Sequence, residues 1–406
     1  MDSLLFSLAP DELLLTVLNY SVDCDHLFQM ISFHNDRMYN NSQCLILARE
    51  KVSYQTGLRT NQFNMDKLKD LSKFRFARNI HAGNSSSFTM TNNGKIYASG
   101  QYNRKPDNLF EEYNSKEGIP TIIPELDNII HIAGITGETF FLKSNEYQNS
   151  LHLCGTRVDG TYSMIDKNTI FNIDDIVQVS PGWYYLLLLT SKGTVYQKKY
   201  NIISPTLLDL DDIIQVSAGH DHCLFLTSDG NVYSLGCNEY GQLGVDTSMK
   251  STNNPILIPN MNNIVQIVAG NSFSLLLNAD GYVYMFGSQD GALERGYIPI
   301  LLPVDNIIQI SAINHCLLLR ADGTVYGFGW NHFGQLGLNH TEYKIYIPTI
   351  IPELNNIISV SAGFHHSMVL DKDGQIYVFG DNNAGQLGLS DNENRSVPVI
   401  NPYFHI

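Results

Sequence analysis

The chain has 406 residues, enough for one large β domain and a small accessory domain. It carries 40 Asp and Glu residues against 25 Lys and Arg residues, a formal net charge of −15, and contains no run of five basic residues. Such an acidic surface repels phosphate backbones and anionic lipid heads, so we expect no nucleic acid and no membrane among its partners.

Two further absences narrow the expected class. The 6 cysteines form no CxxC pair, which argues against a zinc or redox site and favours reduced structural thiols. No stretch of 18 apolar residues occurs, and the first residues lack the basic start and apolar run of a signal peptide. We therefore expect an intracellular protein, cytoplasmic or nuclear.

Residues 1–60 are expected to be helical. Pro10 suits the first position of a helix, and the two acidic residues after it favour the positive helix end. In that helix Leu13 and Val17 share a face, as do Leu14 and Leu18. Residues 61–78 would connect this region to the rest of the chain.

The segment LAPDELLLTVLNYSVDCDHLFQM, residues 8–30, resembles the start of an F-box. The resemblance implies that the region binds a Skp-type adaptor of a cullin-type ubiquitin ligase. The apolar positions that would hold the adaptor are Leu8, Pro10, Leu13, Leu14, Val17, Leu18 and Leu27. A helical cap that packs on the following domain fits the same residues, so both interpretations stay open.

From residue 79 onward the chain repeats itself. The segment DIIQVSAGHDHCLFLTSDGNVYSLGCNEYGQLG, residues 212–244, returns in closely similar form at 306–337 and 356–388. Weaker copies begin at residues 79, 128, 175 and 263. The small-residue turn of the seven units falls, at spacings of 37 to 51 residues, on Gly83, Gly134, Gly182, Gly219, Gly270, Ile313 and Gly363. A period of this length indicates a propeller or a solenoid.

Each unit has the pattern of a four-stranded antiparallel sheet. Residues 213–216 alternate and are β-branched, and 224–227 form a second apolar run. Asp229–Gly230 predicts a tight hairpin of the primed two-residue type, and the third strand carries Tyr233. The Pro-flanked run 256–258 suits an edge strand, because proline cannot donate to a ladder. The predicted fold is therefore all-β, a seven-bladed β-propeller over residues 79–406, preceded by the small α-helical region.

Ring closure is also predicted. The last unit is followed by a Pro-containing strand, and we found no such strand in front of the first unit. We expect residues 396–401 to pair into the first blade and close the ring, which would remove two exposed sheet edges.

Once the repeat is subtracted, nothing in the sequence indicates catalysis. There is no Ser/His/Asp or paired-carboxylate arrangement and no GxGxxG or GxxxxGK[ST] loop, so we expect no catalytic residue, cofactor or metal. Three histidines at one repeat position could form a ring of ligands, but a reused position favours hydrogen bonds to the backbone of neighbouring blades. The repeat positions expected to be structural are Gly219, His222, Gly241, Gly244, His315, Gly334, Gly337, Gly363, His366, Gly385 and Gly388.

The blocks GxNxxGQLG at Gly236–Gly244, Gly329–Gly337 and Gly380–Gly388, joined to SAGxxH and DGxVYxFG, resemble the regulator of chromosome condensation repeat family. The resemblance covers roughly residues 79–401 and implies a seven-bladed propeller. The founding member exchanges nucleotide on the small GTPase Ran and docks on nucleosomes, whereas other members are scaffolds or ubiquitin-ligase subunits.

The expected function is a protein–protein interaction scaffold, the substrate receptor of a cullin-type ubiquitin ligase. Its partners would be a Skp-type adaptor and an unidentified target. The alternative is a guanine-nucleotide exchange factor for a Ran-like small GTPase, although no insertion is large enough for the exchange wedge of the founding member. Target specificity is expected in loops that break the repeat, at Asn103–Glu112, Met249–Asn254 and Asn339–Lys344.

Overall fold

The computed structural model describes residues 80–91, 95–100, 118–123, 126, 129–135, 138–143, 150–155, 173, 175–199, 202, 204–245, 249–288 and 297–404. The predicted N-terminal helices, the F-box-like segment, the connector and the loop Asn103–Glu112 lie outside these residues. The regular elements of the described ranges are all β-strands. No helix in these ranges is long and apolar enough to cross a membrane.

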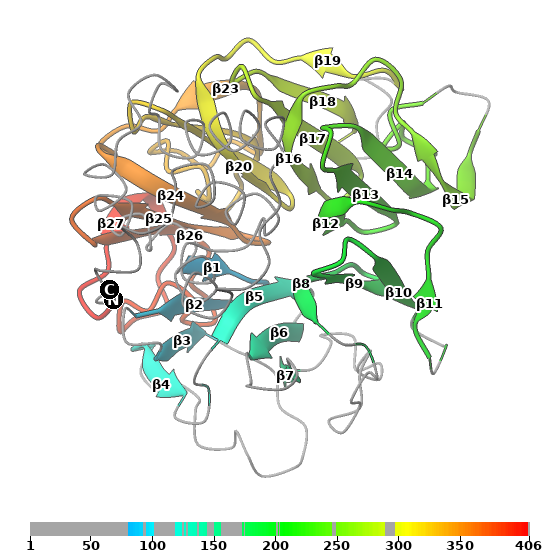
Figure 1. Cartoon of the computed structure of the whole chain (residues 1–406). Coiled ribbons are helices and arrows are strands. Elements are labelled where there is room, and N and C mark those ends of the chain that lie inside the picture. Colours follow the sequence, from blue (N-terminus) through cyan, green and yellow to red (C-terminus); the bar gives the residue numbers. More distant parts are fainter. Residues whose placement is uncertain are drawn as a thin grey trace, which may run out of the picture.

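The described strands form six four-stranded antiparallel sheets and one three-stranded sheet, arranged in a ring around a central axis (Figure 1). We number the sheets 1 to 7 in chain order. Sheet 1 holds β1 (Ile80–Ala82), β2 (Ser86–Met90), β3 (Ile96–Gly100) and β4 (Thr121–Ile123). Sheet 2 holds β5 (Ile129–Ile135), β6 (Glu138–Lys143) and β7 (Ser150–Gly155). Sheet 3 holds β8 (Ile176–Pro181), β9 (Tyr185–Thr190), β10 (Val195–Lys199) and β11 (Thr206–Leu207).

The strongest repeats form the second half of the ring. Sheet 4 holds β12 (Ile213–Ala218), β13 (His222–Thr227), β14 (Val232–Cys237) and β15 (Ser251–Leu257). Sheet 5 holds β16 (Ile264–Ala269), β17 (Phe273–Asn278), β18 (Val283–Gly287) and β19 (Ile300–Leu301). Sheet 6 holds β20 (Ile307–Ala312), β21 (His315–Arg320), β22 (Val325–Trp330) and β23 (Lys344–Ile350). Sheet 7 holds β24 (Ile357–Ala362), β25 (His366–Asp371), β26 (Ile376–Gly380) and β27 (Arg395–Ile400).

The prediction of an all-β propeller is confirmed. Six of the predicted blades are four-stranded sheets, and the second unit has three strands among the described residues. In each four-stranded sheet the strands follow one another in sequence order from the axis outward, so neighbouring strands are joined by local connections.

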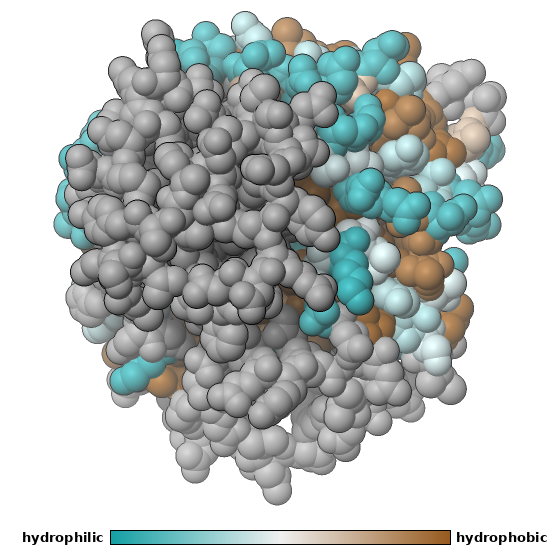
Figure 2. All heavy atoms as spheres, in the orientation of Figure 1, coloured by the Kyte–Doolittle hydropathy of each residue, from teal (hydrophilic) through white to brown (hydrophobic). Residues whose placement is uncertain are grey.

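The hydrophobic core lies between neighbouring sheets. All six residues of β13, and likewise of β17 and β25, are buried, because the second strand of a sheet is covered on both faces. Phe225 of sheet 4, for example, packs in one cluster with Leu187 and Leu189 of sheet 3. Outer strands expose scattered apolar side chains, and in Figure 2 hydrophobic and hydrophilic residues lie interspersed over the sheets at the right of the view. Such scatter is ordinary for a protein surface.

The Asp–Gly hairpins differ in detail from the prediction. The amide N–H of Thr227 donates to the carbonyl of Asn231, and that of Gly230 donates to the carbonyl of Thr227. The loop is thus the three-residue type with glycine in the left-handed region (φ 82°), and not a primed two-residue turn. The glycine also lies against the next sheet, where Ile264 N–H donates to the Gly230 carbonyl at 3.1 Å.

The expectation that residues 396–401 complete the first blade is wrong. β27 pairs with β26 of its own sheet, with Tyr377 opposite Ile400. Sheet 1 is completed by β4, which pairs with β3 so that Ile96 lies opposite Ile123. The Pro-flanked strand therefore follows its own unit in every four-stranded sheet, because the loop after the third strand returns the chain directly to that strand's free edge.

Candidate functional site

One face of the ring holds two kinds of connection. The turns between first and second strands, such as Gly219–Asp221, lie at the same end of each sheet as the loops between third and fourth strands, such as Asn238–Gly244, since the strands are antiparallel. We call this the loop face and the opposite one the hairpin face. The long loops and most half-exposed aromatic side chains of the strong repeats lie on the loop face, so the search for a site begins there.

The repeat histidines lie on three different seams between sheets. His222 Nε2 is 2.9 Å from Oγ of Ser274 in the next sheet, and that hydroxyl donates to the carbonyl of Gln242 at 2.8 Å. Since the serine proton goes to the carbonyl, the imidazole must donate its Nε2–H. Equivalent chains run through His315, Ser367 and Gln335, and through His366, Ser87 and Gln386.

These histidines are neutral at ordinary pH. Burial lowers the pKa of His222 to about 4 and the pKa of His315 and His366 to about 3. Each has a hydroxyl partner in the next sheet, which passes the bond on to a backbone carbonyl, and His222 also bonds the backbone of Phe273 in the neighbouring sheet, the kind of contact that was expected. Within the described ranges no group of three His, Cys, Asp or Glu side chains could hold a metal ion.

The residue that faces the histidine position across the seam is a serine where a histidine is present and a cysteine where another aromatic residue replaces it. Where Tyr185 replaces the histidine, it contacts the thiol of Cys223, and Phe273 packs in one cluster with Cys316. Burial raises the pKa of Cys223 to about 12, so this thiol does not ionise in the folded protein. Cys223 and Cys316 are buried thiols outside any disulfide.

A second set of contacts joins the strands nearest the axis. The side-chain amide of Gln215 accepts from Ile267 N–H at 3.0 Å and donates to its carbonyl at 3.2 Å, and Ser217 Oγ accepts from Ala269 N–H at 2.8 Å. Sequence reasoning missed this role, although glutamine recurs at one strand position in four units. These glutamines are Gln178, Gln215, Gln266 and Gln309.

The seam between sheets 7 and 1 uses the same devices. Ser361 Oγ accepts from Ala82 N–H at 2.9 Å, and Phe364 N–H donates to the carbonyl of Gly83 at 3.0 Å. Ser99 Oγ donates to the carbonyl of Gln386 at 3.0 Å. The ring is therefore closed by inter-sheet hydrogen bonds and packing.

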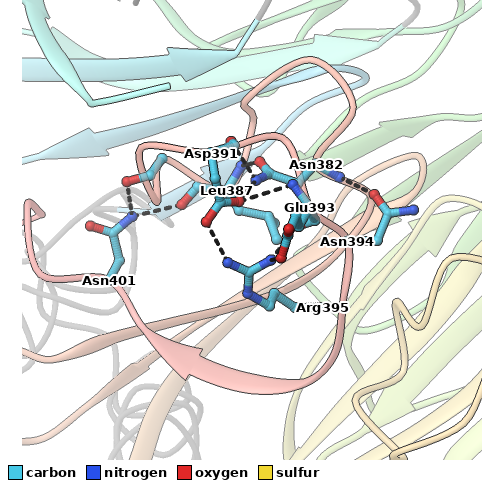
Figure 3. Close-up of polar contacts among 8 residues, drawn as sticks. Asn382, Leu387, Asp391, Glu393, Asn394, Arg395 and Asn401 are labelled. Atoms are coloured by element: carbon cyan, nitrogen blue, oxygen red, sulfur yellow. Dashed lines mark hydrogen bonds and ion pairs between the residues drawn. The ribbon is translucent and has the colours of Figure 1, made fainter. Parts of the chain in front are cut away.

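The asparagine of the GxN motif organises each long loop. In sheet 7, Asn382 Nδ2 donates to the carbonyl and side chain of Asp391, and its Oδ1 accepts from Leu387 N–H at 2.9 Å (Figure 3). Arg395 pairs with Asp391 at 2.5 Å, and Asn401 Nδ2 donates to the Leu387 carbonyl. Asn238 and Asn331 bind their own loops in the same way, so these loops are preformed.

An aromatic cluster spans sheets 6 and 7 on the loop face. Its members are Trp330, His332, Phe333, Tyr343, Phe364 and His365. The His332 ring lies 4.1 Å from that of Phe333 and 5.4 Å from that of His365, and Tyr343 is 59% exposed. Tyr343 belongs to the predicted loop Asn339–Lys344, whereas the aromatic contribution of sheet 7 was not predicted.

The aromatic cluster is uncharged and holds unpaired polar atoms. Burial lowers the pKa of both histidines, that of His365 to about 4. Trp330 Nε1, His332 Nδ1 and His365 Nδ1 have no hydrogen-bond partner. A patch of Trp and Tyr with a polar handle is the composition that dominates binding energy at protein interfaces.

The axis of the ring is hollow. A cavity of about 280 Å³ is lined by all seven first strands and by the turns at the loop face. Six of its lining residues belong to those turns: Trp183, His220, Gly270, Asn271, Ile313 and Phe364. None of the described lining residues is Lys, Arg, Asp or Glu.

The part of the ring that contains the strong repeats matches a known protein family. Residues 201–404 match the RCC1-like domain, which is half of the chain. The chain belongs to the RCC1-like domain family. The matched part begins shortly before sheet 4 and covers the strong repeats, where the loop asparagines and the histidine chains lie.

Two curated relatives illustrate the range of this RCC1-like family. The chain is 32% identical over 169 residues to "Regulator of chromosome condensation" of Mus musculus, covering 38% of this chain and 40% of that protein. It is 36% identical over 177 residues to "Probable E3 ubiquitin-protein ligase HERC4" of Homo sapiens, covering 40% of this chain and 17% of that protein. The chain thus spans less than half the length of either relative.

A solved structure supports the fold of the RCC1-like chain beyond the matched half. Prp20p from Saccharomyces cerevisiae, described with its binding properties to Gsp1p and histones, superposes with a TM-score of 0.50 at 19% identity. The superposition covers 79% of this chain and 76% of that one. At this identity the likeness concerns the fold alone.

Proposed function

We propose that this RCC1-like chain is a protein–protein interaction scaffold whose loop face binds a target protein. The observation that carries the proposal is the aromatic cluster, in which the 59% exposed Tyr343 sits on a loop that Asn331 holds in place and contacts Trp330 at the end of β22. A preformed surface loses little conformational entropy on binding, so its contacts contribute to affinity.

The target-binding role is tested by substitution on the two faces. A double variant, Trp330→Ala with Tyr343→Ala, should fail to crosslink in cells to specific proteins that crosslink to the tagged wild-type chain. Tyr282→Ala, which removes a 42% exposed aromatic side chain from the hairpin face, is the matched control and should remove none of them. An identical set of crosslinked proteins for all three chains would refute the proposal.

The finer proposal is a substrate receptor of a cullin-type ubiquitin ligase. Residues 1–60 would bind a Skp-type adaptor through the apolar positions of the F-box-like segment, and the propeller would hold the substrate. The name of the human relative HERC4 supports a link between such propellers and ubiquitin ligases. An adaptor of this kind also agrees with an intracellular location.

Purified Skp-type adaptor provides the test of that finer role. The full chain should retain the adaptor on a resin, and Leu13→Asp with Leu14→Asp should abolish retention while leaving the propeller folded. Retention that persists in the double variant would show that the adaptor binds a surface other than the one that contains Leu13 and Leu14. Failure of the wild-type chain to retain the adaptor would favour the helical-cap interpretation.

Nucleotide exchange on a Ran-like GTPase is the second candidate. It is favoured by the similarity to the mouse regulator of chromosome condensation and by the likeness in fold to Prp20p, whose title names Gsp1p. Release of a fluorescent GDP analogue from a Ran-like GTPase measures it directly. Release accelerated by the full chain, and equally by the Leu13→Asp, Leu14→Asp variant, would place this activity ahead of the receptor role.

We also propose that sheet 2 is the seventh blade of the propeller. Its strands β5, β6 and β7 pair as the first three strands of every other sheet do, and β5 packs beside β8 of sheet 3. This would give the closed seven-fold ring that the repeat count predicts.

A further inference from the structure

On the loop face, His220 lines the central cavity and pairs with Asp221, which lies beside the cavity and not in its lining; the repeat does not explain this pair. His220 Nδ1 lies 2.7 Å from Oδ2 of Asp221, and both side chains remain accessible, at 27% and 35% exposure. In the other described turns the two positions hold different pairs. These are Asn84–Ser85, Trp183–Tyr184, Asn271–Ser272 and Phe364–His365. Among the described turns the His–Asp pair is particular to sheet 4.

Aromatic rings surround the pair. The Trp183 ring lies 4.6 Å from the His220 ring at an interplanar angle of 32°, and the Tyr184 ring meets His220 edge-on at 5.6 Å. Tyr184 is 50% exposed. The carboxylate of Asp221 accepts the Nδ1–H of the His220 imidazole.

These groups suit a planar cation. A guanidinium has several N–H donors in one plane and stacks on aromatic faces, and indole offers the strongest cation–π attraction. The Asp221 carboxylate supplies the opposite charge. No Lys or Arg is among the described residues that line the cavity, and the whole chain has a net charge of −15.

The size of the cavity limits the occupant. At about 280 Å³ it lies just below the range for ligand pockets, which run from about 300 to 1,000 Å³. A single long side chain with its flanking backbone fits that space better than a nucleotide or an organic cofactor. Phe364 lines the cavity and also belongs to the aromatic cluster, so one partner can reach both.

We propose that a surface patch at the mouth of the central cavity binds an arginine side chain of the target protein. The patch consists of Trp183 and His220, which line the cavity, and of Tyr184 and Asp221 beside them. The proposal rests on the proposed function, that the loop face binds a protein, and adds which residue type the target must present. The arginine would stack on the aromatic rings and donate to Asp221, while its neighbours in the target contact the aromatic cluster.

The experiment uses the full chain and the peptide acetyl-Gly-Arg-Gly-amide. Its citrulline analogue, which keeps the shape and loses the charge, is the matched ligand control. Titration followed by NMR should shift the Trp183 indole signal saturably with the arginine peptide, with Kd in the millimolar range, and at least tenfold more weakly with the citrulline peptide. Equal binding of both peptides, or no shift at Trp183, would overturn the proposal.

Two variants locate the site. Asp221→Asn keeps the acceptor for His220 and removes the charge. It should weaken binding of the arginine peptide about tenfold and leave the melting temperature of the chain unchanged. Tyr343→Ala, on the same face, should leave the affinity for the peptide as in the wild type. An Asp221→Asn chain that still binds the peptide fully would overturn the proposal.

The same variants separate this inference from the function it rests on. If Trp330→Ala and Tyr343→Ala lose the crosslinked target while Asp221→Asn keeps it and keeps the peptide, the loop face binds a protein without the arginine site. If Asp221→Asn alone loses the peptide and no aromatic-cluster variant loses any protein, the arginine site stands and the proposed scaffold surface fails.

Discussion

Nε2 of His366 lies 2.8 Å from Oγ of Ser87, although the two residues are 279 positions apart in the sequence. The Ser87 hydroxyl in turn donates to the carbonyl of Gln386 at 2.7 Å. His222, Ser274 and Gln242 form the same chain of hydrogen bonds between sheets 4 and 5. The last sheet thus meets the first as any sheet meets its neighbour, with one difference: no covalent connection crosses this seam.

Ser87→Ala should weaken the closing seam. The change leaves the buried Nε2–H of His366 without its acceptor, which costs about 1–3 kcal/mol of unfolding free energy. Urea unfolding measures the loss, and Ser274→Ala at the internal seam is the matched control with a similar expected cost. Only Ser87→Ala should also increase hydrogen exchange in both β1 and β24, because no chain connection holds those strands together. Equal exchange patterns for the two variants would contradict the account of closure.

Acid should destabilise the fold before most carboxylates titrate. His222, His315 and His366 have folded pKa values of about 4, 3 and 3 against 6.5 in the unfolded chain, because burial disfavours the charged ring. The unfolded state therefore binds more protons between pH 6.5 and about 4. Stability is complete above pH 6.5 and falls as the pH decreases through that window, by about 1.4 kcal/mol per pH unit for each histidine.

The histidine contribution can be isolated by substitution. A His222→Phe, Ser274→Cys double variant copies the Phe273–Cys316 pair of the neighbouring seam and removes one titrating group. Its unfolding free energy should depend less steeply on pH between 6.5 and 4.5 than that of the wild type. An unchanged slope would mean that the acid sensitivity has another source.

Deleting residues 395–406 should expose sheet 7 and leave sheet 1 paired. The deletion removes β27, whose partner is β26, and the Asn401 side chain that donates to the carbonyls of Leu387 and Gly388. Hydrogen exchange should increase in β26 and in the loop 381–394, and the free edge should promote aggregation. Loss of hydrogen-exchange protection in β3 before β26 would instead indicate that the last strand pairs with sheet 1.

Gly323→Ala should destabilise the propeller from the hairpin face. Gly323 has a φ of 85°, and an added Cβ would lie 2.9 Å from Cα of Asn356 in the next sheet. Backbone strain and the close approach together should cost about 1–3 kcal/mol in chemical unfolding. Lys372→Ala, an exposed change in the equivalent hairpin of sheet 7, should stay within about 0.5 kcal/mol of the wild type.

The prediction of the propeller succeeded because its signals are local. The alternation in 213–216 and the glycine after Asp229 describe contacts within one unit, and the repeat multiplies each signal. The hairpin type was wrong because a dipeptide does not distinguish two-residue from three-residue loops. The predicted adaptor residues of the N-terminal region lie outside the described residues and stay a prediction.

The candidate site was harder to predict than the fold. Tyr343 fell in a loop that the broken repeat pointed out, but its neighbours in the aromatic cluster include His365, which comes from a different sheet. His220 and Asp221 lie inside the strongest repeat, and no sequence signal singled them out. Comparing that turn with the equivalent turns in the other units would have revealed the exception.

By itself the sequence determined the unit: where strands begin and turn, which faces are apolar, and how many times the pattern returns. Only the tertiary structure decided which sheet receives the last strand, which side chain faces each buried histidine and which loops meet around the cavity. The physical reason is that strand alternation and turn conformation depend on neighbouring residues. The pairing of sheets depends instead on side chains up to 279 positions apart, which only the closed ring brings within hydrogen-bond distance.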